Sequence, residues 1–555
     1  MNHSHVEVSY RGQQHRVPSG TTVAELVRAA DGGIPDTVLS ALVNRRQVML
    51  DFPIRGSADL ELVVYGDREG EAVYKRSVSF LFYEACLELF PELKPVIGQS
   101  LGNSYHYQVR GEHPGLDEVA SRVEARMREI VAERRPFVRH TNTIEEVENF
   151  FRERGRDDKL ALLKTRRSSS VHTLSCGSFV DIAHGPCAPH TGCLPTFGLL
   201  AFEDGLLLRF PRRGDRGHLP KLTPRPLLFA IYTETRLWQE LLEVRNVGQL
   251  NTLSLDGGIR SIVRVAEGLH EKKISQIADE ILGRWPVTRL VTIAGPSSSG
   301  KTTFAERLGI QLRVNGLEPV SLSLDNYYVD RDATPLDEQG HPDFESLDAI
   351  DLALFHQQLA ELMEGRRILA PRFDFVRGMR RPEEDRLPLQ LGDNQVLVIE
   401  GIHGLNGQLT ESVPRHRKYR IYVSALSQLA IDDHNRIFTS DARLIRRIVR
   451  DRMFRGFTAE RTLELWDRVR RGEGRWIFPY QEDADVMFNS ALVYEPAVLK
   501  NYAERFLLQV PRSSRAYPEA FRLLKFLSLF VPVFPDEVPH TSLLREFIGG
   551  GGFNY

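Results

Sequence analysis

Cysteine is scarce in this chain, and neither sign of charge is in clear excess. Four cysteines among 555 residues are too few for a disulfide framework and are typical of a protein from a reducing compartment. The chain carries 72 basic and 74 acidic side chains. That balance argues against a dedicated nucleic-acid-binding surface, although it leaves local basic patches open.

Long apolar runs are lacking as well. The longest run, residues 526–534, is far below the roughly 18 residues that span a bilayer. Residues 1–6, Met-Asn-His-Ser-His-Val, hold no apolar signal core. We therefore expect a cytoplasmic protein with no membrane partner. At 555 residues the chain is also too long for one hydrophobic core, so about three or four domains are expected.

One short segment carries the clearest chemical signal. Residues 295–303 read Gly-Pro-Ser-Ser-Ser-Gly-Lys-Thr-Thr and fit the phosphate-binding pattern G-x-x-x-x-G-K-[ST]. An apolar run at 289–294 predicts a buried strand before this loop, and the spacing over 304–313 predicts an amphipathic helix after it. A strand, a glycine loop and a helix start direct backbone N–H groups and the helix dipole at one anion. The segment predicts a nucleoside triphosphate site but does not say what receives the phosphate.

We expect ATP and magnesium at this loop. Lys301 would reach the outer phosphates, and the Thr302 hydroxyl would hold magnesium. The residues expected to contact ATP are Gly295, Pro296, Ser297, Ser298, Ser299, Gly300, Lys301, Thr302 and Thr303.

Carboxylates follow two further predicted strands. Asp325 comes after the run 319–324, and Glu400 comes after the run 395–399. Because the carboxyl ends of strands line the ligand crevice of an open α/β sheet, Asp325 can accept a proton from an acceptor hydroxyl. Glu400 can position magnesium there. The alternatives are that Asp325 caps a turn and that Glu400 is a buried structural acid.

The predicted helix over residues 443–451 is rich in arginine. Arg443, Arg447 and Arg450 share one face at helical spacing. Such a face suits a lid that clamps ATP phosphates and stabilises transition-state charge. The alternative is a solvated face paired with acidic side chains. No Asn-Lys-x-Asp guanine signature occurs in the sequence, so a GTPase is disfavoured.

The order of motifs between residues 286 and 495 is specific. In chain order they are 295–303, 323–328, Pro342-Asp343, Phe373-Asp374-Phe375, Glu400-Gly401 and 446–451. This region resembles the uridine kinase and phosphoribulokinase family, which implies a P-loop kinase domain built on a parallel sheet. The roles that the resemblance implies are a catalytic base at Asp325, phosphate contacts at Lys301, Arg447 and Arg450, and acceptor contacts at Asp343, Tyr328 and Phe373.

Two departures from that family bear on the acceptor. Uridine kinases of this type offer a tyrosine and a histidine to the pyrimidine, and the matching positions here are Phe373 and Gly378. Phe373 can stack on a base but cannot donate a hydroxyl hydrogen bond, so uridine specificity does not carry over. Three arginines crowd the same segment and would suit a more polar or anionic acceptor: Arg372, Arg377 and Arg380. In addition, Phe457 stands where the family often has another lid arginine.

Residues 1–66 predict a small mixed sheet with one helix. A hairpin at 6–17 precedes a helix at 23–30 that Thr21 or Thr22 can cap, and strands follow at 41–44 and 60–65. The segments 22–26, Val43-Asn44 and 51–54 resemble a TGS domain, a ubiquitin-like module. The resemblance implies a site for RNA or a small regulatory ligand, and the alternative is a packing module without a ligand.

Residues 67–225 resemble the second N-terminal domain of threonyl-tRNA synthetases, an α+β domain. The matching features are 73–77, Ile97-Gly98, a charged helix at 116–133 and the loop 179–190. None of that family's metal ligands is kept, because the matching positions are Arg76, Phe80, Ala183 and Cys187. Editing-type hydrolysis is therefore disfavoured, and binding or scaffolding is expected. A separate set repeats every three residues and has ligand chemistry that suits zinc, with an ordinary polar loop as the alternative: His184, Cys187, His190 and Cys193.

Residues 226–285 predict a helical connector, with helical spacing at 274–282, and 496–555 form a C-terminal extension. The extension contains helical spacing near 521–530 and ends in four glycines at 549–552, for which a flexible end is expected. The joining of the three larger parts resembles a bacterial nucleoside or uridine kinase type. The sequence leaves the oligomeric state open.

These patterns together predict an ATP- and magnesium-dependent kinase that phosphorylates a hydroxyl of a nucleoside-like small molecule. A kinase for a non-nucleoside acceptor, such as a sugar phosphate, is the nearest alternative. An RNA-binding or translation-linked regulator that uses ATP as a switch is the alternative from another class, and it draws on the two N-terminal parts.

Overall fold

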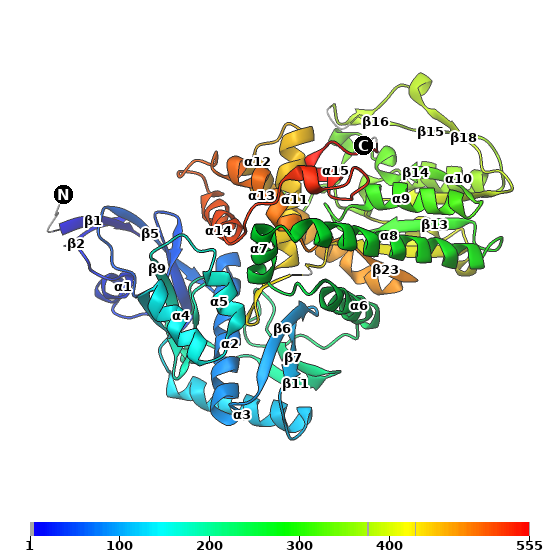
Figure 1. Cartoon of the computed structure of the whole chain (residues 1–555). Coiled ribbons are helices and arrows are strands. Elements are labelled where there is room, and N and C mark those ends of the chain that lie inside the picture. Colours follow the sequence, from blue (N-terminus) through cyan, green and yellow to red (C-terminus); the bar gives the residue numbers. More distant parts are fainter. Residues whose placement is uncertain (1–4, 375–376, 428, 554–555) are drawn as a thin grey trace.

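The computed structural model describes residues 5–374, 377–427 and 429–553. An N-terminal sheet lies at one end of the molecule and a parallel sheet at the other (Figure 1). The predicted multidomain fold class, mixed α+β and α/β, is confirmed, while the boundaries of the five predicted segments stay predictions. In the described part of the chain, no helix is both long and apolar enough to cross a membrane.

The N-terminal sheet has the strand order β2-β1-β5-β3-β4, with β1 antiparallel to β2 and parallel to β5. Thr22 begins the helix through a capping box: its hydroxyl accepts the Glu25 N–H (3.2 Å), and the Glu25 carboxylate accepts the Thr22 N–H (2.8 Å). The predicted hairpin, cap and helix are confirmed. The elements are β1 His5–Tyr10, β2 Gln13–Pro18, α1 Val23–Asp31, β3 Val38–Val43, β4 Arg46–Val48 and β5 Ala58–Val64.

The next region builds two antiparallel sheets, ordered β11-β12-β7-β6 and β10-β9-β8. The predicted charged helix at 116–133 is confirmed as α3. The segment 73–77 lies inside α2, which begins five residues earlier at Arg68. The elements are α2 Arg68–Leu89, β6 Lys94–Ser100, β7 Ser104–Arg110, α3 Leu116–Glu133, β8 Val138–Thr143, α4 Ile144–Glu153, α5 Asp157–Leu163, β9 Ser170–Cys176, β10 Phe179–Ile182, β11 Gly198–Phe202 and β12 Gly205–Arg209.

Three helices connect this region to the parallel sheet, and the predicted helix at 274–282 is the end of the longest of them, α8. The sheet has the order β14-β19-β13-β20-β23, all parallel. The elements are α6 Pro226–Leu242, α7 Val247–Asp256, α8 Ile259–Gly283, β13 Leu290–Ala294, α9 Lys301–Val314, β14 Glu318–Ser323, α10 Leu352–Met363, β19 Gln395–Glu400, β20 Lys418–Ser424, α11 Thr439–Phe454, α12 Ala459–Trp476 and β23 Val486–Asn489.

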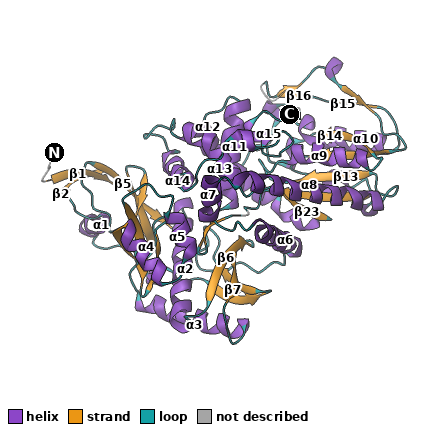
Figure 2. Cartoon of the chain, viewed as in Figure 1, coloured by secondary structure: helices purple, strands orange, loops and turns teal. Residues whose placement is uncertain are grey.

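Helices cover both faces of the parallel sheet (Figure 2). Val291 and Ile293 of β13 share a core with Phe304 of α9, while Leu290 of the same strand shares a core with Phe355 of α10. Alternate side chains point to opposite faces of a strand, and all of β13 is buried. A strand covered on both sides therefore shows the continuous apolar run that the sequence displays.

Short hairpins and the C-terminal helices complete the fold. The expected helix near 521–530 is α14, and the four glycines are held rather than free, because the Gly552 N–H donates to the His540 carbonyl (2.9 Å). The elements are β15 Ile368–Ala370, β16 Phe373–Asp374, β17 Met379–Arg380, β18 Leu387–Leu389, β21 Ala430–Asp432, β22 Asn435–Arg436, α13 Glu495–Leu507, α14 Tyr517–Leu527 and α15 Arg545–Ile548.

A buried cluster of charges joins the second region to the parallel-sheet region. The Lys159 ammonium, fully buried on α5, lies 2.5 Å from Asp181 of β10 and 2.9 Å from Asp432 of β21. His434 of the same hairpin lies 3.1 Å from Asp181. Burial alone would lower the pKa of Lys159, but the two carboxylates outweigh it and raise the pKa above its usual value. The ion pairs therefore bind the two regions together.

We predict that Lys159→Met destabilises the protein strongly, because it leaves two carboxylates buried without their cation. Breaking a buried pair from one side costs about 3–5 kcal/mol. Urea unfolding measures the loss in the free energy of unfolding. Arg122→Met is the matched control, because Arg122 and Glu118 form a half-exposed pair on α3 and such pairs contribute less than about 1 kcal/mol. A similar small loss in both variants would contradict the prediction.

Candidate nucleotide and acceptor site

The predicted loop lies where three parallel strands end at the same edge. In the strand register, Ile293 of β13 and Ser323 of β14 both lie opposite Glu400 of β19. Gly295 and Asp325 each follow their strand within two residues, and Asp325 belongs to a short 3-10 helix, Leu324–Tyr327. The strand order places β13 between β19 and β20, the position where ligands enter open α/β sheets. The structure thus brings the loop, Asp325 and Glu400 together.

The loop has the backbone of an anion-binding turn. Ser298 (φ +59°) and Gly300 (φ +83°) are left-handed, and α9 begins at Lys301 with Gly300 as its N-cap. Gly300 also has no room for a side chain, because a Cβ would lie 2.3 Å from Leu543. The Lys301 ammonium donates to the Pro296 carbonyl (3.3 Å). Successive N–H groups in such a turn, followed by a helix start, favour a bound anion.

Glu400 lies in a crowded acidic corner. The Ser323 hydroxyl donates to its carboxylate (3.2 Å). Burial, and then the charge of Asp325, raises the pKa of Glu400 to about 7, although Lys301 acts in the opposite direction. Carboxylate and hydroxyl oxygens are the ligands that magnesium prefers. Glu400 and the Thr302 hydroxyl therefore fit a magnesium site, whose charge would favour ionised Glu400.

The arginines of α11 separate into two groups. Arg447 donates to the Ser297 hydroxyl of the loop (2.9 Å), and Arg450 lies 3.3 Å from Glu546. Arg443, expected on the same lid face, is instead buried and pairs with Glu473 through both carboxylate oxygens (2.5 and 2.6 Å). Arg443 also donates to the Ser297 carbonyl (3.3 Å), so it shares the side of α11 that faces the loop, while α12 supplies the glutamate that pairs with it.

Glu473 has a second contact, which sequence reasoning missed. Its carboxylate also accepts the Ser297 N–H of the loop (3.1 Å). Arg446, next to this pair, is buried against Glu495 (2.8 Å) and donates to the Ser298 carbonyl (3.3 Å). The residues of these two ion pairs therefore hold the loop backbone by hydrogen bonds. No local pattern identifies Glu473, because α12 carries many charged residues at similar spacing.

The predicted acceptor residues lie close together. The Tyr328 and Phe373 rings are 5.8 Å apart between centroids, and the Asn326 side chain accepts the Phe373 N–H (3.2 Å). The Tyr328 hydroxyl donates to the Phe344 carbonyl (3.2 Å), directly beside Asp343 in the chain. Phe375 of the same motif lies outside the described residues. The structure therefore assembles the predicted tyrosine, phenylalanine and aspartate.

The arginines of the acceptor segment differ in their roles. Arg380 pairs with Asp351 (3.0 Å) and donates to the Tyr328 carbonyl (3.2 Å), so it supports the fold. Arg372, Arg377 and Phe457 are exposed. Gly378 is left-handed (φ +71°), and a Cβ there would lie 2.6 Å from the Arg331 guanidinium. Arg331, which sequence reasoning missed, therefore fills the space beside Gly378.

Glu345 is a further acid that the sequence motifs did not single out. Its N–H donates to Asp343 (3.2 Å), and one of its carboxylate oxygens is buried without a hydrogen-bond partner among the described residues. Burial, and then the charge of Glu473, raises the pKa of Glu345 to about 7, while Arg447 and Lys301 lower it. Glu345 therefore lies between the phosphate loop and the acceptor residues.

The positions of the synthetase-like metal site are filled by side chains. Arg76 donates to the Pro186 carbonyl (2.7 Å), and Phe80 packs on Phe179 with ring centroids 4.8 Å apart. Cys187 is buried beside Arg76, which acts to lower its pKa, but burial dominates and raises that pKa to about 11. A buried protonated thiol next to a guanidinium does not fit a metal ligand.

The four residues of the repeated His and Cys set do not gather around one point. His184 lies 3.2 Å from Asp432. His190 and Cys193 gather with Asp36 in a group whose ligand atoms lie within 4.8 Å of one another. Arg134 already binds Asp36 through both nitrogens (2.7 and 2.8 Å) and reaches His190 (3.0 Å). A guanidinium holds the carboxylate that a metal would need.

Comparison with known proteins finds similarity in two parts of the chain. Residues 290–494 match the family described as the phosphoribulokinase / uridine kinase family. The N-terminal region is similar to threonine–tRNA ligases. That of Desulforamulus reducens is 32% identical over 185 residues (33% of this chain, 29% of that protein), and that of Symbiobacterium thermophilum is 32% identical over 191 residues (34% and 29%). The chain spans about three tenths of the length of these relatives.

Solved structures with similarity to this chain include kinases. One described as a possible uridine kinase from Bacillus stearothermophilus is 18% identical, covers 39% of this chain and 98% of its own, and has a TM-score of 0.29. A D-glycerate 3-kinase from Cryptococcus neoformans is 18% identical, covers 48% and 89%, and has a TM-score of 0.22.

The pKa of Glu400 yields a pH prediction. Between pH 6 and 8, a carboxyl with a pKa near 7 passes from about one tenth to about nine tenths ionised. Since magnesium binds the ionised form, the magnesium concentration needed for half-maximal ATP binding should fall about tenfold over that range. Calorimetric titration at each pH measures it. Glu400→Gln should remove the effect, whereas Glu345→Gln, which loses another acid with a pKa of about 7, should keep it. An unchanged pH profile in Glu400→Gln would contradict the assignment.

Proposed function

We propose that this protein is an ATP- and magnesium-dependent kinase that phosphorylates a hydroxyl of a nucleoside-like small molecule. The observation that carries the proposal is the meeting of the phosphate loop, Asp325 and Glu400 at one edge of the parallel sheet. The family match over residues 290–494 supports the same class of chemistry. A phosphate loop alone would serve many nucleotide-binding proteins; a carboxylate beside it, close to the predicted acceptor residues, favours transfer.

The proposed mechanism assigns one task to each group. The loop N–H groups and Lys301 bind the triphosphate, and Arg447 adds positive charge beside Ser297. Magnesium, held by Thr302 and Glu400, would neutralise charge on the phosphates. Asp325 accepts the acceptor's hydroxyl proton as its oxygen attacks the γ-phosphorus and ADP leaves. Arg450 would join the phosphates once it parts from Glu546.

The acceptor residues favour a molecule with a flat ring and hydroxyls. Tyr328 and Phe373 offer two neighbouring aromatic rings, and Asp343 offers a carboxylate to hydroxyl groups. A sugar phosphate is the second candidate, because the Arg331 guanidinium occupies the place beside Gly378 where a base-reading side chain would stand. The N-terminal regions are proposed to act as a scaffold, with RNA or a regulatory ligand at the N-terminal sheet as the alternative.

We predict that Asp325→Ala abolishes phosphate transfer and leaves ATP binding within about twofold. Loss of a general base costs about 10²- to 10⁴-fold in rate, whereas the loop that holds ATP is unchanged. A coupled assay for ADP release and calorimetric ATP titration measure the two effects. Asp332→Ala, a change to an exposed acid nearby, serves as the control. Turnover equal to that of the native protein would refute the assignment of Asp325.

An acceptor screen separates the two substrate classes. Nucleosides and sugar phosphates are offered to the full chain with ATP and magnesium, and ADP release is recorded. We expect turnover with a nucleoside, and we expect Phe373→Ala to raise its KM about tenfold, since stacking of a base on an aromatic ring contributes about 1–3 kcal/mol. Phe344→Ala, a change to an exposed neighbour, is the control. Turnover with sugar phosphates alone would replace the nucleoside proposal with the second candidate.

A further inference from the structure

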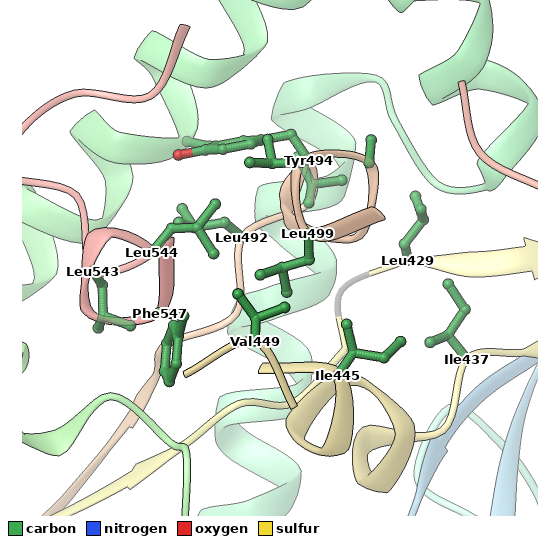
Figure 3. Packing of buried hydrophobic residues seen from close by; sticks show 14 of the residues in the cluster. Leu429, Ile437, Ile445, Val449, Leu492, Tyr494, Leu499, Leu543, Leu544 and Phe547 are labelled. Carbon is green, nitrogen blue, oxygen red and sulfur yellow. The ribbon is translucent and has the colours of Figure 1, made fainter. Parts of the chain in front are cut away.

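The chain's own C-terminal segment lies against the phosphate loop. Leu543, Leu544 and Phe547 are fully buried, and Figure 3 shows them in one cluster with Val449 of α11 and other apolar side chains. The backbone here is fixed, because the Arg545 guanidinium donates to the carbonyl groups of Pro535, Val538 and Gly549. Glu546 therefore projects from a firmly held segment.

Glu546 contacts hydrogen-bond donors and a cation that a bound triphosphate would need. One carboxylate oxygen accepts the Thr303 hydroxyl (2.9 Å) and faces the Thr303 N–H (3.4 Å), and the other lies 3.3 Å from Arg450. Thr303 is the third residue of α9, and the first N–H groups of a helix have no partner within the helix. The carboxylate therefore lies at a helix start, a place that favours a bound phosphate.

A carboxylate and a phosphate cannot share these donors. Two anionic oxygens at one N–H repel each other, and the repulsion is strong where water is excluded, as at Thr303 and Glu546, which are both buried. Glu546 is also close enough to raise the pKa of Glu400, so its charge reaches the proposed magnesium site. The nucleotide therefore has to displace the carboxylate to use the start of α9 and Arg450.

We propose that Glu546 is an internal competitor of the nucleotide that sets the affinity for ATP. In the empty site its carboxylate holds Thr303 and Arg450; when ATP binds, the side chain rotates away, and Arg450 is released onto the phosphates. Only the side chain has to move, because the backbone of the segment is anchored. This inference rests on the proposed function, since it requires ATP at the loop.

The test compares Mg·ATP affinity, by calorimetry on the full chain, between the native protein and Glu546→Gln. The amide keeps the size of the side chain and removes its charge, so we expect binding at least tenfold tighter. Glu537→Gln is the matched control, because Glu537 lies in the same C-terminal extension but pairs with the exposed Arg260 (2.9 Å), and its affinity should equal that of the native protein.

A second variant guards against failure of the first to fold. Glu546→Asp keeps the charge but withdraws it from Thr303 by one methylene, and we expect an intermediate tightening. Equal or weaker ATP binding in both Glu546 variants, beside measurable binding by the native protein, would overturn the inference and leave the proposed function intact. Absence of ATP binding in every variant and in the native protein would overturn both.

Discussion

The arrangement of the synthetase-like region and the parallel-sheet region depends on the ion pairs of the Lys159 ammonium. This ammonium is buried between Asp181 of the synthetase-like region and Asp432 of the β21–β22 hairpin, and an unpaired charge at such a depth would be costly. That hairpin leads directly into α11, the helix that carries Arg447 to the phosphate loop. The ion pairs at one end of this connection therefore help to position, at the other end, the arginine that contacts the phosphate loop.

Three carboxylates lie close to the phosphate loop or to the cations around it. Glu473 lies below it against Arg443, Glu546 at the start of α9 against Arg450, and Glu400 beside Lys301. A site that gathers cations and N–H groups for a triphosphate is itself unstable while these groups are unpaired. Here the chain's own acidic side chains pair with these cations and N–H groups. On the proposed function, an incoming anion would have to compete with these carboxylates for the same cations and N–H groups.

Local patterns predicted the elements well and their partners poorly. The strand–loop–helix at residues 290–314, helix α3 and the Thr22 capping box follow from short-range spacing and confirm the expectations. The positions of Asp325 and Glu400 followed because parallel strands end at one edge. The partners of the arginines could not be predicted: Arg443, Arg446 and Arg450 pair with glutamates 30, 49 and 96 residues away. Helical spacing fixes which residues share a face, but not which elements pack against that face.

In the core of the synthetase-like region, side chains fill the space of the related proteins' metal site. Where a metal would draw four ligands together, the Arg76 guanidinium binds the loop carbonyl of Pro186, and Phe80 extends the aromatic core. His434 of the β21–β22 hairpin then packs on Tyr83, with ring centroids 4.1 Å apart, and contacts Asp181. Side chains from both regions fill this space, so neither a metal nor a substrate is needed to hold it. A region filled in this way is suited to support its neighbour, because side chains of both regions pack together in its interior.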